Sequence, residues 1–294
     1  MDFVLSGQHS PFYLAAAKGW YADNGLDVTV QEGAGSGPAV TLVGNKSIEF
    51  AFVDGLSLAT AVGKGMPVKM VSRVFGQWGQ GIMALPKTKL DNAKDLEGKT
   101  LGLSPGTSVM QLWPAFVANA KIDVSKVTIV NVTAQAKRQL LYTDKLDVMQ
   151  GAQSDYVNVT ADYKAEPKVL WFWDYGLGVM GYGIIAHNDM IKDKPDLVKG
   201  FVAATLKAYD YARQNPDEAI AAMVKAQPDV NRPTLKDELA TWIKNCWDTV
   251  NTKGKPTGWM SDKDWQATED IAEQYLGQPK TTIDNFYTND FLPK

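Results

Sequence analysis

The sequence holds few of the residues on which many active sites depend: one cysteine, two histidines and four arginines among 294 residues. The single cysteine, Cys246, excludes an intrachain disulfide and a cysteine-rich metal site, and its helical spacing predicts a core position. The two histidines, His9 and His187, are too few for histidine-based zinc chemistry. Because no set of side chains for nucleophilic or acid–base catalysis is visible either, we expect no catalytic residue, no metal and no cofactor.

An excess of charge of one sign is also lacking. The 30 Lys and Arg residues against 33 Asp and Glu residues give a formal net charge of −3, with both signs mixed along the chain. A nucleic-acid partner would require a basic excess or a basic stripe on the protein. We therefore expect no nucleic-acid partner.

Long apolar runs are absent from the sequence. No stretch approaches the ~20 continuous apolar residues of a membrane span, and no signal peptide is visible. Met1 directly precedes DFVLSG, which reads as the inside of a first strand. We therefore expect Met1 to stand in place of a removed leader.

What the sequence does contain is a repeated alternation of strand and helix patterns, which predicts an α/β fold with parallel strands. In the first third, strands are expected at 2–5, 26–31, 48–53 and 68–75, with helices at 12–20, 39–43 and 55–63. The pattern restarts after a chain crossing at 83–86, with expected strands at 100–103, 128–132, 146–151 and 169–173 and helices at 109–120 and 136–142.

A second crossing follows near Ile185, and the chain from Lys194 onward reads as amphipathic helices. One α/β unit with another inserted into it predicts two lobes with a hinge and a cleft between them. Residues 1–83 plus 186–294 would form lobe 1, and residues 84–185 would form lobe 2. The ligand of such a protein binds in the cleft, at the C-terminal ends of strands.

Two turns rich in small residues follow strands and open helices. In SPGTS, Ser104, Thr107 and Ser108 lie at a helix start, where free N–H groups favour a carboxylate, a sulfonate or a polar heteroatom; the alternative is that one hydroxyl only caps the helix. In GAGSGP, the glycines permit close approach of a ligand and Ser36 offers a hydroxyl, whereas the alternative is a tight turn without ligand contact. The GxGxG spacing without a following GKS or GKT disfavours a phosphate-rich cofactor.

Further candidates follow strands or lie in loops. Asp54 would either accept hydrogen bonds from a ligand or cap the next helix. Trp78 is suited to stack on a flat ligand and Gln80 to bind its edge. Gln8 and His9 end the first expected strand, where His9 would contact a ligand or only make structural hydrogen bonds. The remaining candidates follow the strands that end near residues 151 and 173: Gln153, Asp155, Trp173 and Tyr175.

The run from His9 to Asp54, HSPFYLAAAKGWYADNGLDVTVQEGAGSGPAVTLVGNKSIEFAFVD, resembles the periplasmic solute-binding proteins of ABC importers. It is similar to their branch for nitrate, sulfonates, taurine and thiamine pyrimidine precursors, and DLEGKTLGLSPGTSV resembles the second unit of that branch. The resemblance implies the type II periplasmic-binding-protein fold. It also implies an extracytoplasmic monomer that closes on a small solute and delivers it to an ABC permease in the membrane.

Three ligand classes remain open. An inorganic oxyanion or alkyl sulfonate would need Arg or Lys in the strand-end loops, which contain none. A pyrimidine-like ligand would use the aromatic, carboxylate and amide side chains named above, and an aromatic or other organic acid would use the two helix starts. We favour these two over the oxyanion. The resemblance also leaves open a pyrimidine-biosynthetic enzyme of the same fold, although the fungal enzymes carry a cysteine-rich motif that this chain lacks.

Overall fold

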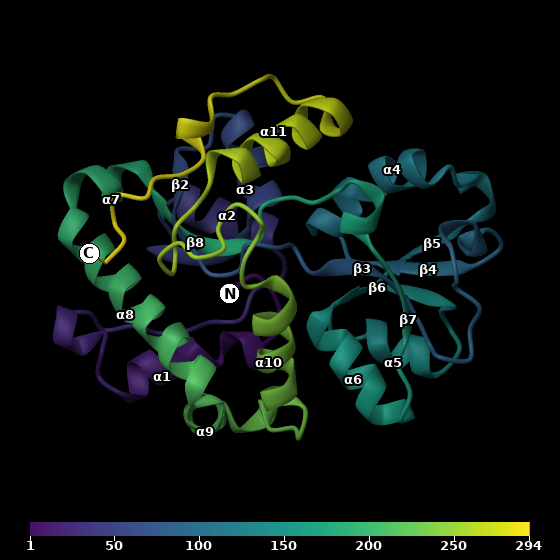
Figure 1. Ribbon diagram of the computed structural model, residues 1–294, viewed down its shortest axis with the longest axis horizontal. Coiled ribbons are helices and arrows are strands. Elements are labelled where there is room, and N and C mark those ends of the chain that lie inside the picture. Colours follow the sequence, from purple (N-terminus) through teal and green to yellow (C-terminus); the bar gives the residue numbers. More distant parts are fainter. Residues whose placement is uncertain (294) are drawn as a thin grey trace.

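The computed structural model describes residues 1–293 as two β-sheets with helices packed around each (Figure 1). The smaller sheet has the strand order β1-β8-β2, with β1 (Phe50–Asp54), β8 (Tyr182–His187) and β2 (Val68–Arg73). The larger sheet has the order β5-β4-β6-β3-β7, with β5 (Thr128–Asn131), β4 (Thr100–Leu103), β6 (Val148–Ala152), β3 (Gln80–Ala84) and β7 (Lys168–Trp171).

The strand directions differ from the expected parallel arrangement. β8 is antiparallel to both β1 and β2, so the prediction of parallel strands is wrong for the smaller sheet. In the larger sheet β4 is parallel to β5 and β6, whereas β3 is antiparallel to β6 and β7. The antiparallel strands β3 and β8 are those by which the chain enters a sheet from the other half of the molecule. The alternation of strands and helices is a local pattern, so it cannot predict the direction of a strand that enters a sheet from a distant part of the molecule.

Helices cover the two sheets in separate groups (Figure 1). Around the smaller sheet lie α1 (Ser10–Ala17), α2 (Ser36–Gly44), α3 (Gly55–Gly63), α7 (Asn188–Asp193), α8 (Pro195–Gln214), α9 (Pro216–Ala226), α10 (Leu235–Cys246) and α11 (Asp262–Leu276). Around the larger sheet lie α4 (Ser108–Ala120), α5 (Lys137–Tyr142) and α6 (Gln153–Tyr163). The helices predicted from Lys194 onward are confirmed. Short 3-10 turns occupy Gly7–His9, Ala22–Asn24, Ala93–Leu96, Val124–Lys126, Phe172–Tyr175, Pro228–Val230 and Ile283–Asn285.

Two segments that alternate like strands are not strands. Residues 26–31 form no β-ladder with another strand, and the chain bends within residues 2–5. The bend is held by side chains, because the Leu5 N–H donates to Glu32 at 2.8 Å and the Asp2 carboxylate accepts a hydrogen bond from His9 at 2.9 Å. These contacts turn residues 2–5 toward the space between the two sheets.

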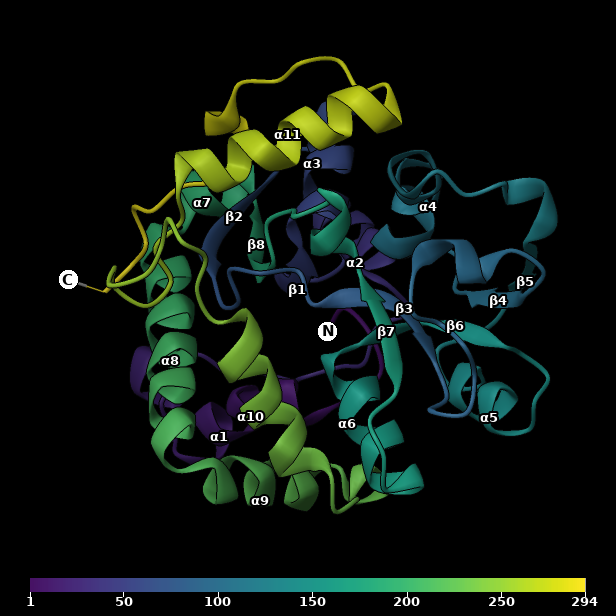
Figure 2. The same cartoon turned by 45° about the vertical axis from the view of Figure 1, so that its right-hand side comes forward.

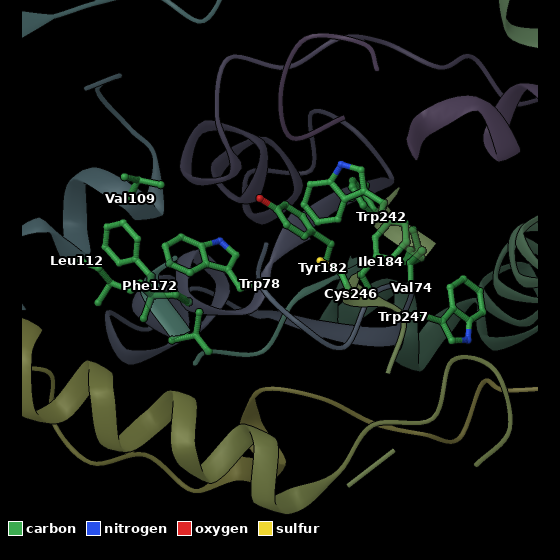
Figure 3. Packing of buried hydrophobic residues seen from close by; sticks show 14 of the residues in the cluster. Val74, Trp78, Val109, Leu112, Phe172, Tyr182, Ile184, Trp242, Cys246 and Trp247 are labelled. Carbon is green, nitrogen blue, oxygen red and sulfur yellow. The ribbon is translucent and has the colours of Figure 1, made fainter. Parts of the chain in front are cut away.

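The chain passes between the two halves earlier than the sequence pattern indicates. β3 already belongs to the larger sheet and β8 belongs entirely to the smaller one. The passages therefore lie in residues 74–79 and 172–181 rather than at 83–86 and near Ile185. Both passages run through apolar packing: Trp78 and Phe172 meet edge to face with ring centroids 5.4 Å apart (Figure 3).

The hydrophobic core extends through both passages. Away from Trp78 and Phe172, the same core contains Trp242, Trp247 and Tyr182, which pack near Cys246 (Figure 3). Cys246 is fully buried, which confirms its core position, and burial raises the pKa of its thiol far above the ordinary range. Within residues 1–293, no helix combines the length and the apolar character that crossing a membrane requires.

Candidate functional site

A cavity of about 300 Å³ lies between the two halves and is lined from both. The half built on the smaller sheet contributes Gln8, Ser36, Asp54 and Tyr182 among others. The other half contributes residues near the starts of α4, α5 and α6, among them Ser108, Lys137 and Asp155. The N-terminal segment also reaches the cavity, and in both views the N-terminus lies between the halves (Figures 1 and 2). We call this space the central cavity.

The two small-residue turns meet at the edge of the central cavity. A Cβ added to Gly35 would lie 3.0 Å from the carbonyl oxygen of Gly106, and one added to Gly37 would lie 3.2 Å from it. Gly35 and Gly106 also have φ values of +142° and +78°, which L side chains rarely adopt. The glycines of both turns thus allow two backbones from different halves to touch.

A side-chain hydrogen bond crosses between the halves at the same place. The Ser108 hydroxyl donates to Asp54 Oδ2 at 3.1 Å, and Ser57 donates to the same carboxylate through its N–H at 2.9 Å and its hydroxyl at 3.0 Å. Asp54 therefore caps the N-terminus of α3, which is one of the two roles expected from the sequence. Ser36 accepts from the Asp54 N–H at 3.2 Å, which ties the GAGSGP turn to the same point.

The carboxyl group of Asp54 is buried. Burial raises the pKa of its carboxyl above the ordinary value, and hydrogen bonds from Ser57, Ser36 and Ser108 oppose that shift. A buried carboxylate surrounded by hydroxyl donors is a strong acceptor for an N–H group.

A buried ion pair forms the opposite wall. Lys137 Nζ lies 2.6 Å from Asp155 Oδ2, and both side chains are largely shielded from solvent. Burial tends to raise the pKa of Asp155, but the charges of Lys137 and Arg138 outweigh it and hold that pKa below its ordinary value. The Asp155 carboxylate also accepts the Ala152 N–H at 2.9 Å and so fixes the start of α6.

A third buried carboxylate lies behind the cavity. Glu238 on α10 is fully buried and accepts hydrogen bonds from the Gly7 N–H at 2.7 Å and from Arg232 at 2.8 and 2.9 Å. The Asn158 amide of α6 donates to it at 2.7 Å. Glu238 thus joins the two halves where α6 and α10 lie side by side (Figure 2).

The turn after residue 5 presents an amide to the central cavity. Gln8 is 5% exposed and lines the cavity, and its Oε1 has no hydrogen-bond partner within residues 1–293. Its neighbour His9 points inward: Nδ1 accepts the Ser6 N–H at 3.1 Å and Nε2 donates to Asp2 at 2.9 Å. His9 is fully buried and makes the structural hydrogen bonds that were one of its two expected roles.

Two aromatic side chains line the cavity. Phe3 lies on the bent N-terminal segment, and Lys137 Nζ lies 5.5 Å from its ring centroid. Tyr182 on β8 is buried, and its hydroxyl accepts a hydrogen bond from Gln80 Nε2 at 2.7 Å. The pair offers a flat ligand aromatic contact near groups that bind its edge.

The structure brings together seven of the thirteen residues named from the sequence. These seven line the central cavity: Gln8, Ser36, Asp54, Gln80, Thr107, Ser108 and Asp155. The other six lie outside its lining: His9, Trp78, Ser104, Gln153, Trp173 and Tyr175. Of these six, Ser104 lines a neighbouring groove instead.

The expected aromatic residues pack elsewhere. Trp78 is 1% exposed and belongs to the passage between the halves, and Trp173 stacks on Trp171 with centroids 5.1 Å apart. Tyr175 packs on Phe116, also away from the cavity. The expectation that these three rings face the cleft is therefore wrong. The glycine that follows Trp78 serves close packing at this chain passage, because a Cβ added to Gly79 would lie 2.6 Å from Cys246 Sγ.

The expected strand-end loops contain no Lys or Arg, but the central cavity is lined by three such residues from other places within residues 1–293. Lys137 and Arg138 at the start of α5, and Arg232 between α9 and α10, line the central cavity. Their signal in the sequence was the pair Lys137-Arg138 after a strand and a short turn. Arg232 gave no local signal, because only the packing of α10 on the N-terminal turn brings it to the site.

Comparisons with known proteins identify the family. Residues 6–219 match the family described as NMT1/THI5 like, and the chain belongs to this family. The chain is 26% identical to the riboflavin-binding protein RibY of Chloroflexus aurantiacus, over all of this chain and 85% of that protein. It is 22% identical to the formylaminopyrimidine-binding protein of Halalkalibacterium halodurans, over 97% of this chain and 88% of that protein.

A third relative is named as an enzyme. The 4-amino-5-hydroxymethyl-2-methylpyrimidine phosphate synthase of Legionella pneumophila is 23% identical over all of this chain and 91% of that protein. Among solved structures, the alkanesulfonate-binding protein SsuA of Xanthomonas axonopodis pv. citri, bound to MOPS, superposes with a TM-score of 0.75. That comparison covers 96% of this chain and 95% of SsuA at 14% identity, which confirms the periplasmic-binding-protein fold.

Proposed function

We propose that this protein captures a flat nitrogen heterocycle, a pyrimidine or a larger fused ring, in its central cavity and delivers it to an ABC permease. The observation that carries the proposal is the Gln8 carboxamide in the lining of that cavity: one of its ends lies 3.3 Å from His9 Nε2, and the other is buried without a hydrogen-bond partner within residues 1–293. A buried amide without a partner costs stability unless a ligand satisfies it. A nitrogen heterocycle is a suitable partner, because it offers N–H donors and ring-nitrogen acceptors on the same edge.

The charge of the cavity supports a heterocycle over an inorganic anion. Five carboxylates and three cations line it. Two of the cations are engaged, since Lys137 pairs with Asp155 and Arg232 pairs with Glu238. A nitrate or sulfonate ligand would have to compete with these carboxylates, whereas an N–H donor would be attracted by them. The two relatives named as riboflavin-binding and formylaminopyrimidine-binding agree with this ligand class.

One residue favours a second candidate, an aromatic acid. Arg138 lines the cavity and makes no ion pair within residues 1–293. Its guanidinium is suited to hold a carboxylate while Phe3 and Tyr182 contact the ring.

The chain's candidate reactive groups support binding over synthesis, although one relative is named as a synthase. The Cys246 thiol is buried in the core with a raised pKa, and both ring nitrogens of His9 are held by Ser6 and Asp2. Neither group can reach a molecule in the cavity without rearrangement.

The proposed mechanism is hinge closure. Lobe 1 would comprise the segments around the smaller sheet and lobe 2 those around the larger, with residues 74–79 and 172–181 as the hinge. A ligand that contacts both lobes stabilises the closed form. The closed monomer would then present its joined surface to the permease outside the cytoplasm, and solved neighbours named as periplasmic sulphonate-binding and nitrate-binding proteins support that location.

The test is thermal melting against pyrimidines, flavins, aromatic acids, alkyl sulfonates and nitrate. A ligand at ~100 times its Kd adds ~2.7 kcal/mol of stability, which raises the Tm by several degrees. A rise with heterocycles alone supports the proposal, a rise with aromatic acids alone supports the second candidate, and a rise only with sulfonates or nitrate contradicts both.

A matched pair of variants locates the site. Gln8→Leu removes the free amide and should weaken heterocycle binding about tenfold. Gln153→Leu is the control, because Gln153 is equally buried but lies outside the cavity lining. Equal effects of the two variants on affinity would contradict the placement of the ligand at Gln8.

A further inference from the structure

A groove of about 350 Å³ opens beside the central cavity. It lies between residues 33–34 of one half and residues 104–105 and 131–135 of the other. Phe3, Ala134 and Gln135 line both spaces, so the groove lies directly next to the central cavity. We call it the side groove.

The side groove differs from the central cavity in charge. Its lining within residues 1–293 holds no charged side chain, whereas eight charged side chains line the central cavity. The polar side chains that it offers are all neutral: Ser104, Asn131, Thr133 and Gln135. Hydroxyl and carboxamide groups of this kind bind hydroxyl groups and give no compensation to a phosphate or carboxylate.

Ser104 at the base of the side groove is the second observation. It is 3% exposed, and its hydroxyl has no hydrogen-bond partner within residues 1–293. Its backbone is held on both sides, since its N–H donates to Gln150 Oε1 at 2.7 Å and its carbonyl accepts from Thr107 at 2.7 Å. The backbone that carries the free hydroxyl is therefore held in place, so the missing partner is not a consequence of a loose turn.

We infer that the ligand carries a neutral, hydroxyl-bearing substituent on its ring, and that this substituent occupies the side groove with a hydrogen bond to Ser104. The inference rests on the proposed function, because it assumes that the ring lies in the central cavity. The ring contacts Phe3, and the substituent leaves it past Ala134 and Gln135 into the side groove. An unsubstituted ring leaves the Ser104 hydroxyl unsatisfied.

Two ligand series test the inference by calorimetry on the full chain. Each series holds one ring constant and varies the substituent: lumiflavin, riboflavin and riboflavin 5′-phosphate, then cytosine, cytidine and cytidine 5′-phosphate. In a series that binds, we expect the hydroxylated member to bind about tenfold more tightly than the bare ring. We expect the phosphorylated member to bind more weakly than the hydroxylated one, because no cation lines the side groove within residues 1–293.

Two variants test whether the higher affinity for the hydroxylated member comes from the side groove. Ser104→Ala should remove about threefold to tenfold of the affinity for the hydroxylated member and leave the bare ring unchanged. Asn131→Cys, alkylated with a bulky maleimide, should block the hydroxylated member only, with the unlabelled variant as control. Asn131 is exposed, and the native thiol of Cys246 is buried, so labelling is selective.

Each outcome has one meaning. Equal affinity for the bare and hydroxylated rings overturns the inference and leaves the proposed function intact. Tighter binding of the phosphorylated member overturns the neutral character of the groove. If no member of either series binds, the proposed heterocycle function fails, and the inference fails with it.

Discussion

The Ser108 hydroxyl at the start of α4 donates to the Asp54 carboxylate at the start of α3 over 3.1 Å. The two residues are 54 positions apart and belong to different halves of the molecule. The same carboxylate binds Ser57 of its own half. One acid thus caps a helix, lines the central cavity and bonds the two halves together, so under the proposed function closure and ligand binding would share a group.

Removing this bond should favour the open form. Ser108→Ala loses the hydrogen bond only in the closed state, so we expect ligand affinity to fall about threefold to tenfold. The radius of gyration from small-angle scattering should rise without ligand. Ser57→Ala is the control, because it loses a bond to the same carboxylate within one half. A scattering change of equal size in Ser57→Ala would contradict the role of Ser108 in closure.

Adding a methyl group at Gly37 should hinder closure without harming the fold. Its Cβ would lie 3.2 Å from the Gly106 carbonyl oxygen, a contact that exists only while the halves touch. We expect weaker ligand binding with a change in unfolding free energy below about 1 kcal/mol. Leu42→Ala on the same helix, α2, is the control, because its side chain is exposed and lines neither the central cavity nor the side groove. Unchanged affinity in Gly37→Ala would show that the turns separate in the liganded state.

Asp54→Asn should alter the pH dependence of stability. The folded pKa of Asp54 is raised by burial, so the folded state binds more protons than the unfolded state between the two pKa values. The wild type therefore loses stability as pH rises from about 3.9 through the folded pKa, by about 1.4 kcal/mol per unit of pKa difference. The substituted amide does not titrate, so the stability of the variant minus that of the wild type should increase with pH over this window. Urea unfolding across this pH window and on to neutral pH measures it, and a constant difference would refute the shift.

Breaking the Lys137–Asp155 pair should be costly because it leaves a buried carboxylate alone. We expect Lys137→Met to reduce the unfolding free energy by about 3–5 kcal/mol. Adding Asp155→Asn removes the charge but keeps an acceptor for the Ala152 N–H, and should recover most of that loss.

The exposed pair Lys168–Asp91 provides the comparison, and Lys168→Met should cost less than about 1 kcal/mol. Denaturant melts of the wild type and these variants measure all of these values. If the double variant is no more stable than Lys137→Met, the uncompensated charge of Asp155 is not the source of the loss.

Part of the site could be predicted from the sequence because its signals are local. Asp54 directly follows an apolar strand, and Ser36 and Ser108 lie in glycine-containing turns that open helices. The C-terminal ends of strands and the starts of the following helices gather at one edge of a sheet, whatever the rest of the chain does. Asp54 ends β1 of the smaller sheet and Ser108 follows β4 of the larger one, whereas the turn of Ser36 follows no strand, so the packing of the two halves is what brings the three residues together.

The sequence by itself determined where most of the strands, helices and glycine turns lie, since apolar spacing and turn residues act over a few positions. Only the tertiary structure decided which of these features face the central cavity. Trp78 lies in a chain passage and Phe3 lies in the cavity, although the sequence favoured Trp78. Lys137 and Arg232 reach the cavity through contacts with distant residues. Such contacts depend on how two sheets and their helices pack, and no short stretch of sequence encodes that packing.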